Sequence, residues 1–302
     1  MNERKVDFAV KRTRKLDPLE NAMQMLFFLC GAVAVAFVLV ITVYLVVSGL
    51  PAIQKMGLGN FLLGTTWDSA NKTDPQYGIL PFILTSIYGT AGAILIGVPV
   101  GFMTAMFLAK AAPPKLAAVV RPAVDLLAGI PSVVYGMVGM VVLLPGIRGL
   151  FHLKAGDTLL AAILVLAVMI LPSIISVSET ALRAVPREYE EASLALGATE
   201  METYFRVSAP AAKSGIAAAV VLGVGRAIGE AMAIMMVAGN AANMPGLFRS
   251  VKFLTTAVAS EMSYAADGSL QKMALFSIGL VLFLFIMMIN VFLNLVLKRE
   301  KE

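Results

Sequence analysis

Residues 186–216 read PREYEEASLALGATEMETYFRVSAPAAKSGI, a charged stretch in a chain that is otherwise mostly apolar. The run LAAILVLAVMILPSIISV (160–177) precedes it and IAAAVVLGVGRAIGEAMAIMMVAG (216–239) follows it. Each run is long enough to cross a bilayer. Because charged side chains at this density belong in water, the pattern predicts a hydrophilic loop between two membrane spans.

The loop carries the signals of two short helices. Pro186 suits a first helical position, and Gly197 suits the residue just past a helix end. Thr199, with Glu202 three residues later, forms a capping box that opens a second helix. Two short helices on a membrane surface favour a rigid docking element, and the plainer interpretation is a solvated connector.

The composition indicates a membrane protein. The 302 residues are 59% hydrophobic and 14% charged, with a mean hydropathy of +0.86, which is too apolar for a soluble domain. The single cysteine, Cys30, excludes an internal disulfide, and the single histidine, His152, argues against a histidine-based metal site. The net charge of +5 does not indicate nucleic acid, because basic residues mark the cytoplasmic loops of membrane proteins.

The apolar pattern predicts six spans, at about 25–49, 80–109, 117–145, 159–182, 214–239 and 273–297. Residues 1–24 are expected to form a charged tail, and residues 299–302 a short C-terminus. Glycines and prolines inside the second and third spans predict close helix contacts or broken helices. Trp67 and Tyr77 are expected at the membrane interface, and the connection 240–272 is expected to hold a short external helix.

The distribution of lysine and arginine predicts the orientation. The tail, the stretch 110–121, the charged loop region and the C-terminus together hold sixteen of the 24 basic residues. The opposite loops hold seven, and Arg226 falls inside a span. Basic residues stay on the cytoplasmic side, so both termini and the charged loop are expected in the cytoplasm.

Arg226 and Glu230 are the sharpest functional candidates, because ionisable residues at membrane depth usually face an aqueous cavity or a bundle interior. Their i, i+4 spacing predicts one shared helix face, and Gly225 with Gly229 leaves room for another helix. Arg226 offers a planar, permanently charged fork that suits an oxyanion. Glu230 can orient Arg226 or accept a hydrogen bond from a protonated oxyanion. A buried structural ion pair is the alternative.

A second candidate group lies in DLLAGIPSVVYG, residues 125–136. Asp125 is an acid near the cytoplasmic end of the third span, Pro131 predicts a kink, and Ser132 can satisfy freed backbone groups. A packing kink is the plainer interpretation. The chain contains no GxxxxGK[ST] phosphate loop and no hydrolase or metalloprotease motif, so ATP hydrolysis is not expected of it.

The charged loop resembles the cytoplasmic signature of importer-type ABC transporter permeases, in which EAA is followed by Gly and then by Ile-x-Leu-Pro. The matching residues here are Glu191-Ala192-Ser193, Gly197 and Val207-Ser208-Ala209-Pro210, of which Ser193, Val207 and Ala209 depart from the consensus. The resemblance implies that Glu191, Ala192, Gly197 and Pro210 belong to a coupling loop, residues 183–213, that sits in a groove of an ATPase subunit.

Three further stretches resemble the phosphate-specific branch: LLAGIPSVVYG (126–136), SETALRAVPREYEEASLALGAT (178–199) and GRAIGEAMA (225–233). YGILPFILTSIYGT (77–90) is more similar to the PstC type than to its paralogue. The resemblance covers residues 25–298. It implies an all-α membrane protein with about six transmembrane helices, of the type I ABC importer permease (MetI-like) fold, in a bacterial plasma membrane.

The resemblance also implies the function and the partners. The permease would translocate inorganic phosphate as a heterodimer with a PstA-type permease, supplied by an external phosphate-binding protein. A dimer of ATPase subunits would hold ATP and Mg, and this chain would hold no cofactor of its own. Arg226 and Glu230 fall on the arginine and glutamate that the family needs for transport, and Asp125 stands where the family usually has Glu.

Three other functions stay open at this point. The first is a permease for another oxyanion, such as molybdate or sulfate. The second is a membrane-embedded enzyme, against which the scarcity of His and Cys argues. The third is a signalling scaffold, for which intramembrane Arg226 and Glu230 are costly residues.

Overall fold

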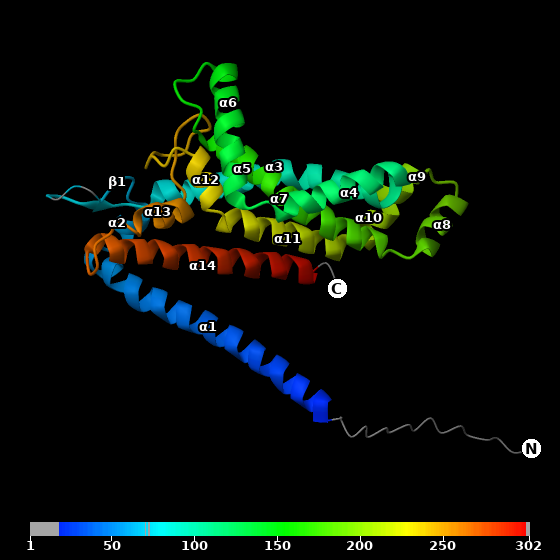
Figure 1. The fold of residues 1–302 in the computed structure, drawn as a ribbon, viewed down its shortest axis with the longest axis horizontal. Helices are drawn as coiled ribbons and strands as arrows, with labels where there is room; N and C mark the ends of the chain where they lie inside the picture. Colours follow the sequence, from blue (N-terminus) through cyan, green and yellow to red (C-terminus); the bar gives the residue numbers. More distant parts are fainter. Residues whose placement is uncertain (1–17, 70, 72, 300–302) are drawn as a thin grey trace, which may run out of the picture.

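The computed structural model describes residues 18–69, 71 and 73–299 as a bundle of helices with one small hairpin (Figure 1). Within this described part of the chain, five helices are long and apolar enough to cross a membrane. A sixth span is counted if the segments Glu200–Ala211 and Lys213–Gly229, bent by 73° at their junction, act as one. The expected all-α membrane architecture is therefore confirmed.

The long helices are α1 (Pro18–Met56), α3 (Leu80–Met106), α7 (Leu159–Arg183), α11 (Lys213–Gly229) and α14 (Leu270–Arg299). The shorter ones are α2 (Leu58–Leu63), α4 (Pro114–Gly129), α5 (Ser132–Val138), α6 (Leu144–Phe151), α8 (Arg187–Ala195), α9 (Glu200–Thr203), α10 (Ala209–Ala211), α12 (Met232–Val237) and α13 (Leu254–Glu261). Among the described residues, three π-helical segments join neighbouring helices, namely η1 (Phe107–Ala111), η2 (Gly139–Leu143) and η3 (Tyr204–Ser208). Strands β1 (Trp67–Asp68) and β2 (Gln76–Tyr77) pair antiparallel.

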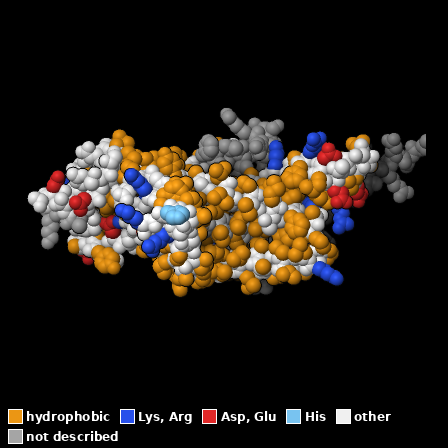
Figure 2. Space-filling view, turned by 90° about the horizontal axis from the view of Figure 1, so that it is seen from above, with side chains coloured by type: hydrophobic (Ala, Val, Ile, Leu, Met, Phe, Trp, Pro, Cys, Tyr) orange, Lys and Arg blue, Asp and Glu red, His pale blue; other side chains and the backbone are white. Residues whose placement is uncertain are grey.

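The bundle has two different ends (Figure 1). One end carries α8 and α9 and is called the loop end here. The other carries β1, β2, α2 and α13 and is called the hairpin end. Helices α3, α7 and α11 run between them, and Figure 2 shows hydrophobic side chains over the middle of one face with charged side chains mainly toward the two ends. This distribution suits a body whose middle lies in lipid.

Helix α7 is the centre of the bundle, and most of its residues are buried. It packs against α3, where a Cβ added at Gly97 would lie 2.6 Å from Ile170 and one added at Gly101 would lie 2.8 Å from Ile174. Such distances leave no room for a side chain, so these glycines allow the two backbones to approach. The close helix contacts expected from the glycines of the second span are confirmed.

Helix α1 packs on α14 and then diverges from the bundle toward its N-terminus (Figure 1). The contact includes Ser277, whose hydroxyl donates to the carbonyl of Gly49 at 2.6 Å. The helix begins at Pro18, so residues 18–24 of the expected tail are helical, whereas residues 1–17 and 300–302 lie outside the described residues. The most apolar part of α1 is not buried within this chain.

The third span differs from the prediction of 117–145. Helix α4 ends at Gly129, Ile130 and Pro131 are extended, and the apolar helical segment that follows covers residues 132–151. A residue before proline is pushed out of the helical region, and Pro131 has no N–H to continue the helix. Helices α5 and α6 therefore leave the bundle crosswise, while α4 lies along α7 (Figure 1).

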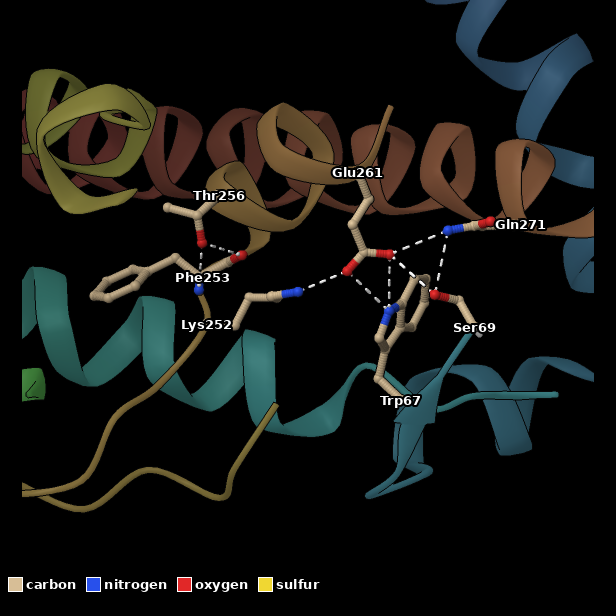
Figure 3. Close-up of polar contacts among 7 residues, drawn as sticks. All are labelled: Trp67, Ser69, Lys252, Phe253, Thr256, Glu261 and Gln271. Carbon is tan, nitrogen blue, oxygen red and sulfur yellow. Dashed lines mark hydrogen bonds and ion pairs between the residues drawn. The ribbon is translucent and has the colours of Figure 1, made fainter. Parts of the chain in front are cut away.

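The hairpin end is tied together by Glu261 of α13, the short helix expected between the last two spans (Figure 3). Its carboxylate accepts hydrogen bonds from Trp67 Nε1 at 3.1 Å and Lys252 Nζ at 2.6 Å. Trp67 and Tyr77 are each only 8% exposed and stack edge to face, so both rings pack inside the protein, and their position at the membrane interface stays a prediction. Burial, with the charge of Glu261, raises the pKa of Tyr77.

Candidate functional site

Arg226 and Glu230 lie on either side of a helix break. Helix α11 ends at Gly229, and Glu230 is extended with φ −73° and ψ 128° before α12 begins. The Glu230 carbonyl accepts from Thr255 Oγ1 at 2.8 Å, and its carboxylate accepts from the N–H of Ala233 at 2.9 Å. These bonds replace those that a continuous helix would supply. The prediction that both side chains share one helix face is therefore wrong.

Arg226 is half-buried in the last turn of α11. Its Nη1 donates to Ser173 Oγ of α7 at 3.4 Å, which is a long hydrogen bond. Among the described residues no ion pair joins Arg226 to Glu230. A guanidinium has five N–H donors, so most of those on Arg226 are left for a ligand. The geometry does not favour the structural ion pair.

The side of α11 beside Arg226 is open. Apart from the chain neighbours and the backbone of the same helix, no atom of the described residues lies within 4 Å of where a Cβ would stand at Gly225 or Gly229. Gly223 is the glycine that faces α7, with Ile174 3.0 Å from its Cβ position. The expected close approach to Gly225 and Gly229 is thus not made within this chain, and the space there is free for a solute or another subunit.

The other two predicted pathway residues are separated by the break at Pro131. Ser132 begins α5, which packs on α12 through Gly136; a Cβ there would lie 3.0 Å from Ala233. The Ser132 hydroxyl makes no hydrogen bond in the described part of the chain, so the expected hydrogen bond to freed backbone groups is not seen. Asp125 lies instead on α4, exposed, at the rim of a hollow near the loop end.

That hollow contains an ion cluster that sequence reasoning missed. Glu179 of α7 is 8% exposed, and its Oε1 accepts from Arg121 Nε at 2.6 Å and from Arg183 Nε at 2.9 Å. Both arginines also donate through Nη2 to the carbonyl of Leu108, at 3.1 and 3.0 Å. The i, i+4 spacing of Glu179 and Arg183 was a signal for half of it. Arg121 comes from 58 residues away.

The charged loop folds as its sequence signals predict. Gly197 has φ +87°, and its N–H donates to Leu194 O at 2.9 Å while Ala198 N–H donates to Ser193 O at 3.3 Å, which is a Schellman ending for α8. The capping box of Thr199 and Glu202 is also confirmed. Pro186 is the residue before the first helical position, one place from the prediction.

Glu190 fixes the loop to η1, the π-helical segment that follows α3. It accepts from Lys110 Nζ at 2.5 Å and from Ser208 Oγ at 2.7 Å, while Tyr204 donates to the Lys110 carbonyl at 3.2 Å. Burial opposes ionisation of Glu190, but the hydrogen bonds from Lys110 and Ser208 outweigh it and lower the pKa. The loop is therefore a rigid attachment.

The outer surface of the loop is exposed and partly apolar. Glu191, Ala192, Gly197 and Pro210 are all exposed. Several large apolar side chains accompany them, namely Tyr189, Leu194, Leu196 and Met201, and Leu196 is 90% exposed. Exposed apolar side chains on a rigid, charged element are typical of a protein docking surface.

An exposed charged loop at one end of an apolar helical bundle and an arginine with unused donors at a helix break are typical of a membrane solute transporter. Residues 97–301, more than half of the chain, match the family described as "Binding-protein-dependent transport system inner membrane component". The chain belongs to this family.

Relatives give the same assignment. The chain is 40% identical over 287 residues to "Probable ABC transporter permease protein YqgH" of Bacillus subtilis (strain 168), covering 93% of this chain and 92% of that protein. It is 37% identical over 284 residues to "Phosphate transport system permease protein PstC" of Haemophilus influenzae, covering 87% and 88%. A structure of the MetNI methionine ABC transporter in inward facing conformations has a TM-score of 0.58 at 21% identity, covering 74% of this chain and 95% of that chain.

The protein is thus an ABC importer permease with a MetI-type fold, and the resemblance to phosphate permeases is confirmed at the level of the family. It is an integral inner-membrane transport component. The family implies an ATPase subunit and a substrate-binding protein as partners.

Proposed function

We propose that this permease translocates inorganic phosphate. The observation that supports it best is that the helix break carries both a half-buried arginine, Arg226, with most of its N–H donors unused and, four residues later, a carboxylate, Glu230, whose Oε2 has no partner among the described residues. The guanidinium suits a tetrahedral oxyanion, and the carboxylate suits the proton that hydrogen phosphate carries. Sulfate and molybdate carry no such proton at neutral pH, so an unpaired carboxylate disfavours them. The PstC relatives agree with this choice.

The partners and the orientation follow from the same proposal. The loop end lies in the cytoplasm with both termini, and residues 183–213, including Glu191 and Gly197, dock on an ATPase dimer that holds ATP and Mg. The hairpin end faces the external phosphate-binding protein. The excess of lysine and arginine at the loop end supports this orientation. This chain itself holds no cofactor.

A PstA-type paralogue completes the pathway. The open space beside Gly225 and Gly229 supports a second permease facing Arg226 across the path. The apolar surfaces of α1 and of α5 with α6 support the same arrangement, since many of their large side chains are exposed in the described part of the chain. Ser132 and Asp125 line the pathway on this proposal.

Labelled-phosphate uptake tests the proposal in vesicles that contain the permease pair, the ATPase and the binding protein. Arsenate, which carries a proton as phosphate does, should compete, whereas sulfate and molybdate should not. A reporter fused after Gly197 should read cytoplasmic, and reporters at Asn71 and Asn240 should read external. Equal competition by sulfate or molybdate would favour the other-oxyanion permease. Assembly without uptake of any oxyanion would favour the enzyme or the signalling scaffold.

A further inference from the structure

We propose a second oxyanion site at the loop end, in the hollow of about 320 Å³ between α4 and α7. It binds a protonated tetrahedral oxyanion between Arg121 and Arg183, with Ser176 as a further donor and Asp125 as acceptor. With the orientation proposed above, this hollow is the last binding site on the path before the anion is released into the cytoplasm. Its role in transport therefore rests on the proposed function.

Hydrogen bonds hold the two guanidinium groups in place, and each group keeps N–H donors that have no protein partner in the described residues. Each gives Nε to Glu179 and Nη2 to the Leu108 carbonyl, which fixes its plane. Within the described residues, the Nη1 of neither arginine has a protein partner. Their side chains are 39% and 47% exposed and line the hollow. Preorganised, accessible N–H donors are what an oxyanion requires.

The charges of the cluster exceed what a structural role needs. One arginine is enough to neutralise buried Glu179, yet both arginines contact the same oxygen, Oε1. The three side chains therefore carry a net charge of one positive unit. The Asp125 carboxylate at the rim balances this charge overall, but within the described residues no ion pair joins it to either arginine. An anion that enters the hollow relieves the repulsion between Arg121 and Arg183.

Asp125 makes the hollow selective. A carboxylate at its rim repels a fully deprotonated oxyanion but accepts a hydrogen bond from one that still carries a proton. Arginine donors combined with a carboxylate acceptor are also the groups proposed to bind the anion at Arg226 and Glu230. The hollow is thus matched to the anion that the helix break is proposed to select.

A hydroxyl stripe on α7 joins the two places. Arg226 contacts Ser173, and Ser176, Thr180 and Arg183 follow at intervals of three, four and three residues. This spacing places them on one helix face, along about 15 Å of helix axis for ten residues. The Thr180 hydroxyl donates its hydrogen to the Ser176 carbonyl at 2.8 Å, whereas the Ser176 hydroxyl has no partner among the described residues.

Arginine footprinting tests the site directly. The purified complex of both permeases and the ATPase, free of nucleotide, is treated with phenylglyoxal, and modification is measured at each arginine by mass spectrometry. Added phosphate should slow modification of Arg121 and Arg183 several-fold, and chloride at the same ionic strength should not. Arg249, exposed at the opposite end, is the internal reference and should react at the same rate throughout.

Variants separate the ligand role from packing. Ser176→Ala and Asp125→Ala should each raise the phosphate concentration needed for protection about tenfold, the scale of one hydrogen bond to a charged group. Thr180→Val is the matched control and should keep the wild-type protection, because the Thr180 hydroxyl offers the anion no hydrogen. Protection unchanged in Ser176→Ala and Asp125→Ala would overturn the site.

Other outcomes also overturn it. If both arginines react slowly even without phosphate, the partner permease covers the hollow. Equal protection by chloride would mean general screening. A complex that transports phosphate but protects neither arginine overturns this site and leaves the proposed function intact. A complex that transports another oxyanion instead overturns the proposed function, while phosphate footprinting still decides the site because it requires no transport.

Discussion

The coupling loop and the helix break at Arg226 differ in how far their polar groups are satisfied. In the loop, Glu190 and Glu202 both accept hydrogen bonds within the chain, and the backbone around Gly197 is closed by two more. At the break, Arg226 makes one long hydrogen bond and has open space beside it. A satisfied element is rigid and transmits force, whereas an unsatisfied donor is available to a ligand. On the proposed function, this difference separates the coupling element from the binding element within one chain.

The largest effect is expected at the break. Arg226→Gln removes the charge, and Arg226→Lys keeps it but loses the planar fork, so both should lower phosphate uptake roughly a hundredfold. Glu230→Gln should do the same. The yield of assembled complex should stay near wild type, because Arg226 holds no buried ion pair in the described chain. Uptake and yield are measured together, and loss of yield in all three variants would make the residues structural.

A smaller effect is expected in the coupling loop. Gly197 has φ +87°, where a side chain costs about 1–2 kcal/mol, and its position faces open space. Gly197→Asp should therefore leave the permease in the membrane but weaken co-purification of the ATPase and uptake several-fold. Gly59→Asp is the control, since Gly59 is also free of neighbours but lacks a positive φ. Normal co-purification together with normal uptake in Gly197→Asp would remove the docking role.

The contribution of the Lys110–Glu190 ion pair to the stability of the folded protein should depend on pH in a defined direction. The pKa of Glu190 is lowered in the folded protein, so its contribution is present above the ordinary carboxylate pKa and is lost as the pH falls through the lowered value. Glu190→Gln should cost about 1 kcal/mol of stability near neutral pH. Thermal unfolding of both proteins across pH measures this. The gap should shrink on acidification, and a gap that grows would contradict the assignment.

The smallest effect is expected at the hairpin end. Trp67→Phe keeps an aromatic ring but removes the N–H that donates to Glu261, so stability should fall by about 1 kcal/mol. Uptake should persist, because the hydrogen bonds and ring contacts of Trp67 within the described residues are with Glu261, Tyr77 and Phe82 and not with Arg226 or Glu230. Thermal unfolding and uptake are measured side by side. Lost uptake with unchanged unfolding would mean that Trp67 acts in transport and not in packing.

The sequence predicted the features that depend on neighbouring residues. Gly197, Thr199 and Glu202 act within one or two helical turns, so their pattern was sufficient. The break at Glu230 was missed because the hydroxyl that completes it, on Thr255, lies 25 residues away. Arg226 and Glu230 alone show a helical spacing and give no sign of it.

Long-range contacts account for the other differences. The cluster around Glu179 combines α4, η1 and α7, and its third group is a backbone carbonyl, which carries no sequence signal. The burial of Trp67 depends on Glu261, 194 residues later. Pro131 did indicate a break, but the same sequence is compatible with one kinked span and with two separate helices. The packing of α5 on α12 decides between these two structures.

The double variant Arg226→Met with Glu230→Met tests the central claim most directly, that Arg226 binds the passing anion. Replacing both charges removes the cost of a stranded partner, so a purely structural pair would recover on double substitution. Complex yield and phosphate uptake are measured together in reconstituted vesicles, against the wild type and both single variants. We predict normal yield and no uptake. Uptake restored in the double variant would contradict the account.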